Sequence, residues 1–308
     1  MLKHILLSIV LTFGLAANAF DYTVGTDGNS VVFNGVKHQL SESTILLTHD
    51  DISGPHIFTD ARAAINAINR SEEDNITLLV TPWVYWIDDP DDEAVRYARP
   101  GSVPWGAEIE ADTLKIIGLS DNPADVVWAV NRGQTQGALG NYTMLHFMGK
   151  SLTVENMTLG NYCNCDLEYA PAPELNRKRR RDAIVQAQIG LLDGCDRLFA
   201  RNVRFISRLN LCPLTGARRS LYKDCYFECT DDALTGSGLY VDCGFTFFSG
   251  KPFYSTASTG AILLNCDIKC LTDGVQYFTK APGMVTAIDT RFTADHPVTL
   301  RWTRDSSP

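Results

Sequence analysis

Short segments in which apolar and polar residues alternate recur through the second half of the chain. They are SLTVENMTL (151–159), RLFARNVRF (197–205), SLYKDCYF (220–227), GLYVDCGF (238–245), ILLNCDI (262–268) and MVTAIDTRF (284–292). Each contains one Asn or Asp at the same place, namely Asn156, Asn202, Asp224, Asp242, Asn265 and Asp289. Because such alternation is typical of half-buried strands, each segment is predicted to be a short β-strand with a polar turn residue.

The spacing of these polar positions predicts a stack of coils. The first gap, from Asn156 to Asn202, is interpreted as two coils with an insertion, and the later spacings are 22, 18, 23 and 24 residues. A period of this length is typical of solenoids, in which each repeat packs on its neighbours. Leucine-rich repeats share the period, but their L-x-x-L-x-L signature is missing. Antiparallel sandwiches do not explain the common register, so the predicted fold is an all-β, single-stranded parallel β-helix.

Upstream of the repeats, the pattern changes to the spacing of an amphipathic helix. FTDARAAINAIN (58–69) has Ala and Ile at helical intervals, with Thr59 or Asp60 at the N-cap position. A short helix here would cap the open end of the stack, as a solenoid requires. NITLLVTPWVYW (75–86) and TLKIIGLS (113–120) are then predicted to be the first strands.

The chain begins with a pattern typical of an export signal. A short polar start is followed by an apolar stretch and by small residues that suit a cleavage site between Ala19 and Phe20. The apolar stretch is too short to span a bilayer comfortably, so we expect a secreted or periplasmic protein without a membrane span. We divide the chain into a signal peptide (1–19), an N-terminal leader or cap (20–57) and the β-helix domain (58–308). A further coil or cap is expected beyond the C-terminus.

Composition bears on the binding partners and on the state of the cysteines. The 308 residues carry a formal net charge of −9, which argues against nucleic acid as a partner. Nine cysteines in an exported protein would suggest disulfides, but Cys225, Cys243 and Cys266 recur at one place in three repeats. We therefore expect mostly buried thiols, with Cys163 and Cys165 as the exception. The spacings are not those of paired zinc knuckles, so no metal and no cofactor is expected, and we expect a monomer.

Four segments follow one another in an informative order. They are FTDARAAINAI (58–68), VTPWVYW (80–86), TLKIIGLS (113–120) and LTVENMTLGN (152–161). They resemble, in turn, the F-x-T-I-Q-x-A-I-x-A opening, the strand ending in P-G-x-Y, the next strand and the N-I-T-F-x-N coil of the pectin methylesterase family, with Trp83 in the place of the glycine. The resemblance covers most of the chain. It implies a right-handed parallel β-helix and a carbohydrate esterase that demethylates homogalacturonan.

The same resemblance implies catalytic positions. YKDCYFECTDDALTG (222–236) aligns with the family's K-D-C-Y-I strand followed by V-D-F-I-F-G, which puts Asp232 at the nucleophile. The family's Gln in Q-A-V, which helps to stabilise the oxyanion, resembles Gln186, with Gln188 as the other choice. The family's Arg in L-G-R-P-W falls near FTKAP, where Lys280 is the nearest equivalent and the Trp is absent.

One catalytic position of the family has no carboxylate here. Its second Asp, the general acid and base in Q-D-T-L, falls within SRLNLCPLTG (207–216), which offers Asn210 or Leu211. Asn210 can donate a hydrogen bond but cannot shuttle protons. Asp231 is an alternative acid, because close carboxylates raise one another's pKa, although a strand would point adjacent side chains to opposite faces. The other interpretation is that both acids cap backbone amides where a strand ends.

Substrate-binding residues are predicted from charge and aromaticity. The Pro-containing, basic stretch LEYAPAPELNRKRRRD (167–182) interrupts the repeats and is predicted to be an exposed loop. Its arginines suit the carboxylates of an acidic polysaccharide, and the alternative is a solvated charged loop. Aromatic residues after the first strands suit stacking on sugars, and the alternative is core or end-cap packing. The candidate residues are Tyr85, Trp86, Arg177, Arg179, Arg180 and Gln188.

Three functions remain open at this stage. The first is a pectin-directed esterase acting on an acidic plant-type polysaccharide. The second is a polygalacturonase-like hydrolase that uses the acid pair, although the G-H-G and R-I-K segments of that family are missing. The third is a catalytically inactive β-helix that binds acidic polysaccharide. Fold alone does not decide among them, because function depends on the site.

Overall fold

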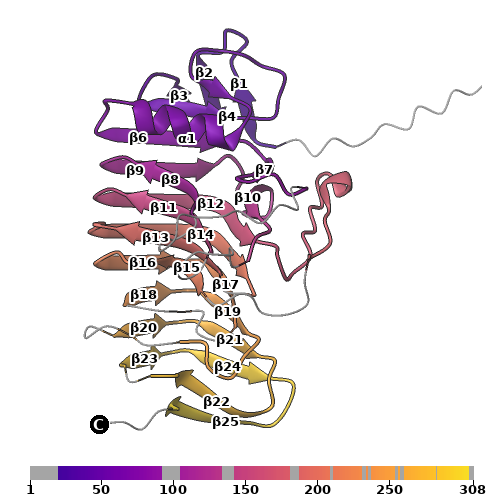
Figure 1. Cartoon of the computed structure of the whole chain (residues 1–308), viewed down its shortest axis with the longest axis vertical. Helices are drawn as coiled ribbons and strands as arrows, with labels where there is room; N and C mark the ends of the chain where they lie inside the picture. The colour runs from indigo at the N-terminus through magenta and orange to yellow at the C-terminus, as the bar shows by residue number, and fades with distance from the viewer. Residues whose placement is uncertain are drawn as a thin grey trace, which may run out of the picture.

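The chain folds into a parallel β-helix that is capped at its N-terminal end (Figure 1). The computed structural model describes residues 20–91, 105–133, 142–180, 187–208, 211–230, 234, 237–253, 256, 260–281 and 283–304. Each coil contributes a strand to up to three faces, and the chain passes from one face to the next at a corner. The predicted fold class is confirmed.

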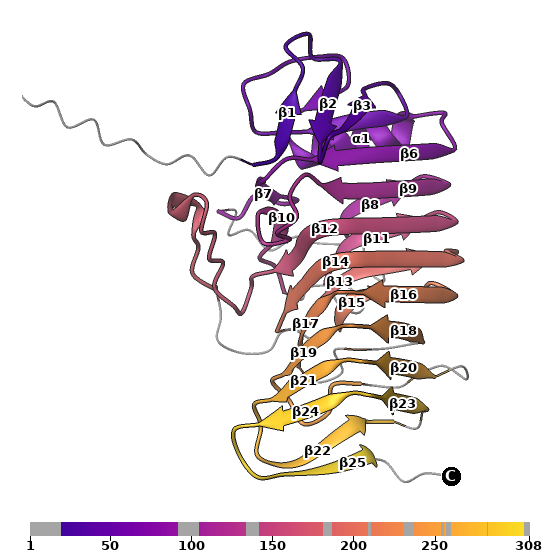
Figure 2. The ribbon, with the colours of Figure 1, turned by 180° about the vertical axis from the view of Figure 1, so that it is seen from behind.

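The first two faces belong to one large sheet, because β12 and β14 bend around the corner between them. The first face contains β4 (Thr44–Leu47), β6 (Asn75–Val80), β9 (Thr113–Gly118), the first part of β12 (Ser151–Asn161) and of β14 (Arg197–Ser207), β16 (Arg219–Lys223), β18 (Gly238–Val241), β20 (Ala261–Leu264) and β23 (Val285–Ile288). The second face contains β7 (Trp83–Trp86), β10 (Val126–Val130), the ends of β12 and β14, β17 (Tyr226–Cys229), β19 (Gly244–Phe247), β21 (Asp267–Cys270) and β24 (Arg291–Ala294). Figure 2 shows both ladders of strands from behind.

The third face is shorter and less regular. It contains β8 (Trp105–Glu110), β11 (Tyr142–Met148), β13 (Ala187–Asp193) and β15 (Leu211–Thr215), and further down the stack β22 (Gly274–Thr279) and β25 (Val298–Thr303). Single parallel bridges, Leu234 with Phe253 and Phe253 with Thr279, continue the face between these two groups.

The recurrent Asn and Asp residues form the corner between the first and second faces. All six have positive φ, between 48° and 56°. Asn and Asp tolerate this left-handed conformation better than other residues with a side chain. Their side chains also bond between coils, since Asn202 Nδ2 donates to Asn156 Oδ1 at 3.0 Å and Asn265 Nδ2 donates to Asp242 Oδ1 at 2.6 Å. The predicted turn residues are therefore confirmed as corner residues.

The coil count between Asn156 and Asn202 was predicted wrongly. β12 pairs directly with β14, with Ser151 opposite Arg197 and Asn161 opposite Ser207. This segment is one coil with an insertion rather than two coils. The insertion, which leaves the second face after β12, contains the 3₁₀ turn η1 (Pro173–Leu175) and stands out beside β7 and β10 (Figures 1 and 2).

The core is a set of columns in which like residues stack from coil to coil. The rings of Phe205, Phe227 and Phe245 follow one another at 4.9 Å between centroids, and those of Tyr222 and Tyr240 at 4.8 Å. These distances match the spacing of about 4.8 Å between hydrogen-bonded strands. The side chains therefore repeat the register of the backbone.

The cysteines belong to this core. The side chains of eight of the nine are described, and all eight are buried thiols. Cys225, Cys243 and Cys266 each follow a corner residue, and each thiol donates to backbone carbonyls inside the solenoid. The expectation of buried thiols is confirmed, while the expected exception is wrong because Cys163 and Cys165 are buried thiols like the others.

The N-terminal end is covered by the predicted helix and by a small sheet. Helix α1 (Ala61–Arg70) begins at Asp60, whose side chain accepts from the amide of Ala63 at 2.8 Å, and it buries Ile65 and Ile68 against the first coil. An antiparallel sheet of β1 (Tyr22–Val24), β2 (Ser30–Phe33) and β3 (Val36–Gln39) lies beside it, and β5 (Ile57–Phe58) pairs with β4. The parallel sheet thus begins at β4, before the boundary predicted at residue 58. No helix in the described residues is long and apolar enough to cross a membrane.

Candidate functional site

In chain order, four of the predicted catalytic positions fall just before third-face segments. In the sequence, Gln186 precedes β13, Asn210 precedes β15, and Asp231 and Asp232 stand between β17 and Leu234. These four residues lie outside the described residues, so their roles stay predictions. The residues that border them define the surroundings of the site.

The described strands place the beginning of the third face at matching points on successive coils. Thr143 of β11 pairs with Gln188 of β13, and Gln188 pairs with Leu211 of β15. By chain order, Leu234 holds the corresponding place one coil further on. Since strands in a sheet pair side by side, consecutive corners are about 4.8 Å apart along the stack.

Lys280 is on the same face as Leu234. It follows Thr279, which bridges to Phe253, and Phe253 bridges to Leu234. The amide of Lys280 donates to the carbonyl of Phe253 at 2.7 Å. Two strand spacings, about 10 Å, therefore separate the backbone near Lys280 from that near Leu234. The catalytic role of Lys280 stays a prediction.

Gln188 is nearly buried, with 8% of its surface exposed. Its Nε2 donates to Thr143 Oγ1 on the neighbouring coil. The amide is therefore engaged in a contact between coils, and its suggested part in stabilising an oxyanion stays a prediction.

A charged cavity of about 340 Å³ borders this corner on the second face. Strands β14 and β17 contribute Arg204, Ile206, Arg208 and Glu228 to its wall. The insertion contributes Tyr162, Cys165, Asp166, Glu168 and Arg179. We call this cavity the arginine pocket.

Two of the acids of the arginine pocket are matched by cations. Arg208 Nε donates to Glu228 Oε2 at 2.9 Å, and its guanidinium lies 4.2 Å above the ring of Phe248. Asp166 accepts from Lys178 Nζ at 2.8 Å and from the amide of Arg179 at 3.1 Å. The bond from Lys178, together with that from the Arg179 amide, lowers the pKa of Asp166. Both carboxylates are thus paired with a cation.

Cys165 in the wall of the pocket is not suited to be a nucleophile. Burial, followed by the negative charge of Glu228, raises the pKa of its thiol to about 12. The thiol therefore stays protonated at neutral pH, and the thiolate is the form that reacts or binds metals. Among the described residues, no group of three or more His, Cys, Asp or Glu side chains is arranged to hold a metal ion.

Two predicted substrate-binding residues instead fasten the insertion to the solenoid. Arg177 donates two hydrogen bonds to Asp91, Nη1 to Oδ1 at 2.6 Å and Nη2 to Oδ2 at 3.0 Å. Its guanidinium lies over Trp86, 5.4 Å from the ring centroid. The insertion is also held by Tyr169, whose hydroxyl donates to the carbonyl of Asp125 at 2.8 Å. These contacts fix the outer wall of the arginine pocket.

The remaining predictions for substrate binding have different outcomes. Tyr85 is wrong as a sugar-stacking residue, because its ring is 4% exposed in the core and its hydroxyl bonds with Thr81 at 2.7 Å. Arg179 lines the arginine pocket, and Arg180 is exposed on the same segment with its amide bonded to the carbonyl of Cys163. Their contact with substrate stays a prediction.

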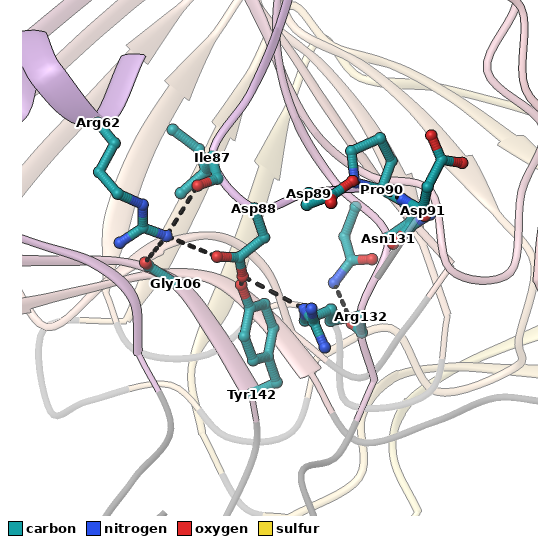
Figure 3. A network of polar contacts seen from close by, with 11 residues as sticks. Arg62, Ile87, Asp88, Asp89, Pro90, Asp91, Gly106, Asn131, Arg132 and Tyr142 are labelled. Carbon is teal, nitrogen blue, oxygen red and sulfur yellow. Dashed lines mark hydrogen bonds and ion pairs between the residues drawn. The ribbon is translucent and has the colours of Figure 1, made fainter. Parts of the chain in front are cut away.

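A buried carboxylate occupies the same corner closer to the N-terminus (Figure 3). Asp88, 4% exposed, accepts from Arg62 at 2.6 Å and from the hydroxyl of Tyr142, and it lies 3.4 Å from Arg132 Nε. Arg62 also donates to the carbonyls of Ile87 and Gly106. Two cations and a hydroxyl surround this acid, so it joins helix α1 to two faces of the solenoid. A carboxylate held in this way is structural, because leaving a buried charge unpaired is costly.

The sequence did not single out Arg204, Arg208 and Glu228. A signal exists in RLFARNVRFISR, where Arg204 and Ile206 in β14 and Arg208 just after it occupy alternate positions and all line the same pocket. The pattern indicates an outward-facing row. It does not indicate which of these arginines has a partner.

Comparisons with known proteins show the fold. A mutant pectin methylesterase solved in complex with a hexasaccharide is similar over 82% of this chain and 80% of its own, with a TM-score of 0.54 and 14% identity. Escherichia coli YbhC is similar over 80% of this chain and 71% of its own, with a TM-score of 0.55 and 15% identity. No family model and no curated protein matches the sequence. The chain thus has a pectin methylesterase-like fold.

Proposed function

We propose that the protein is an exported carbohydrate esterase that removes methyl groups from a pectin-like homogalacturonan. The observation that supports this most is the register at the corner between the second and third faces. Gln188 and Leu211, each within two residues of a predicted catalytic position, pair near the start of the third face on consecutive coils, and Leu234, two residues after Asp232, follows on the same face in chain order. The export signal at residues 1–19 belongs to the same proposal, and an N-terminus at Phe20 in the secreted protein would test it.

In the proposed reaction, the ionised carboxylate of Asp232 attacks the carbonyl carbon of the methyl ester. The bond to the methoxy group breaks as this group takes a proton from a general acid and leaves as methanol, and water then hydrolyses the acyl-enzyme to release the free carboxylate and restore Asp232. Gln186 donates to the oxyanion. Asp231 is the carboxyl group nearest in sequence that can act as the acid, since Asn210 stands where the family has its second Asp.

The test is methanol release from methyl-esterified homogalacturonan by the full chain and by two variants. Asp232→Asn removes the nucleophile and should lower the rate by at least about 10³-fold, as for other catalytic residues. Asp51→Asn, an exposed acid in the N-terminal cap, is the matched control and should retain the rate. Equal rates for the wild type and Asp232→Asn would refute the assigned nucleophile.

One observation favours a second function, the binding of acidic polysaccharide without catalysis. The chain has Asn210 or Leu211 where the family carries its general acid. Under this alternative the wild type releases no methanol but still binds homogalacturonan. Comparing Asp231→Asn with the wild type separates the two, because only an active enzyme can lose activity through this change.

A further inference from the structure

We propose that the arginine pocket binds the carboxylate of a uronic acid residue in an acidic polysaccharide, with Arg204 as the main contact. The assignment of the sugar rests on the proposed function. The anionic character of the ligand rests on the pocket itself.

Arg204 differs from Arg201 and Arg208 in having no counter-ion among the described residues. It lies on β14 between Thr158 and Tyr226 of the neighbouring strands and is half-buried. Within the described part of the chain, its guanidinium makes no hydrogen bond or ion pair, whereas nearby Arg201 bonds to Glu155 at 3.0 Å and Arg208 to Glu228 at 2.9 Å. A half-buried cation without a partner has lost hydration that a bound anion would replace.

The acids of the pocket leave this charge available. Glu228 is bonded to Arg208, and Asp166 is bonded to Lys178, so each carboxylate already has a cation. Glu168 is exposed, and its charge is therefore screened by solvent. A ligand carboxylate that enters the pocket therefore finds its free cation in Arg204.

The accessible lining of the pocket is mostly polar. Tyr162, Ile206 and Cys165 are buried there, each no more than 6% exposed. Gly160 makes room for the tyrosine, because a Cβ at this glycine would lie 2.5 Å from Cε2 of Tyr162. A guanidinium in a polar pocket is a suitable site for a uronate, since Arg binds carboxylates through two parallel hydrogen bonds.

The size and place of the pocket fit one unit of a polymer. Its volume of about 340 Å³ lies within the range of about 300–1,000 Å³ that is usual for small-molecule sites. Arg208 ends one described segment and Glu228 lies two residues before the end of the next, so both shortly precede predicted catalytic positions in the chain. A chain that crosses the corner would place a neighbouring sugar at the pocket.

The experiment is calorimetric titration of the full chain with unesterified trigalacturonate. Arg204→Gln keeps most of the length and a hydrogen-bond donor but removes the charge, and it should weaken binding by about 10-fold or more, as expected when a charge-assisted hydrogen bond is lost. Arg197→Gln is the matched control, because Arg197 is exposed on the same strand but belongs to the first face, and it should bind within about twofold of the wild type. Circular dichroism establishes that both variants keep the fold.

Two further ligands identify the chemistry. Fully methyl-esterified trigalacturonate lacks the charge and should lose the dependence on Arg204, and sodium acetate at the same concentration should not compete. Equal binding of trigalacturonate by the wild type and Arg204→Gln would overturn the proposal. Competition by acetate would overturn the uronate assignment, because it would show a site for any small anion.

The same measurements separate this inference from the proposed function. If Asp232→Asn abolishes methanol release while Arg204→Gln leaves binding unchanged, the esterase stands and the uronate site fails. If no methanol is released but trigalacturonate binds through Arg204, the uronate site stands and the esterase fails.

Discussion

Replacing Asn202 tests whether the corner residues are selected for their backbone conformation. Asn202 has φ of 53°, and its Nδ2 donates to Asn156 Oδ1 at 3.0 Å and to the carbonyl of Asp121 at 2.9 Å. Both Asn202→Ala and Asn202→Gly lose these two hydrogen bonds, at about 1 kcal/mol each. Ala also incurs about 1–2 kcal/mol for the left-handed conformation, which Gly adopts freely.

The order of the two variants is therefore the decisive result. Within a strand, a Gly variant is less stable than an Ala variant by about 0.5–1 kcal/mol, because Gly loses more chain entropy on folding. At residue 202 the Gly variant should instead be more stable by about 0.5–1 kcal/mol, because the cost of the left-handed conformation for Ala exceeds this loss of entropy. Urea unfolding followed by circular dichroism measures the midpoints. Thr153, half-buried within β12, is the control position, and there Thr153→Gly should be less stable than Thr153→Ala. If Asn202→Ala is as stable as Asn202→Gly, the conformational explanation of the corners is refuted.

Two further predictions concern the core and the N-terminal cap. Phe227→Ala should lower the free energy of unfolding by about 3–5 kcal/mol, because the ring is fully buried between Phe205 and Phe245, and urea unfolding checks this against the conservative variant Phe227→Leu. His49 stacks on Trp83 at 4.0 Å, and burial lowers its pKa, opposed by Asp50. The pKa of His49 in the folded protein lies below its unfolded value of about 6.5. Protonation of His49 therefore favours the unfolded chain, so this residue lowers the free energy of unfolding as the pH falls below about 6.5 and has no such effect at higher pH. His49→Gln should flatten the fall in stability between about pH 7 and 5, and an unchanged pH profile would contradict the assignment.

The sequence predicted the features that depend on local chemistry. A corner residue in the left-handed conformation must be Gly, Asn or Asp, so the corners leave a periodic trace, and Asn202 and Asp242 could be found by reading the chain. The coil count failed because the pairing of β12 with β14 is non-local, and nothing within either strand records how much chain lies between them. Tyr85 failed because an aromatic residue in a strand has the same pattern whether it faces a groove or the core.

The polar contacts around the site could not be predicted for a related reason. Asp88 is held by Arg62 and Tyr142, which come from the capping helix and the third face. Each of these residues alone looks like an ordinary surface charge or core tyrosine. Arg204 could not be singled out either, because it is distinguished from Arg201 and Arg208 only by the carboxylate partners that these two arginines have in the structure.

The charge of the whole molecule constrains how it can bind an acidic polymer. A net charge of −9 repels a polyanion at long range, so attraction must come from a few local cations at contact distance. Several arginines are already engaged, since Arg177 is bonded to Asp91 and Arg201 to Glu155. Salt screens exposed charges beyond about 8 Å at physiological ionic strength but screens partly buried contacts much less. A half-buried arginine in a pocket therefore keeps its attraction under conditions in which the repulsion is largely lost, and for this reason Arg204 can bind an acidic sugar to an acidic protein.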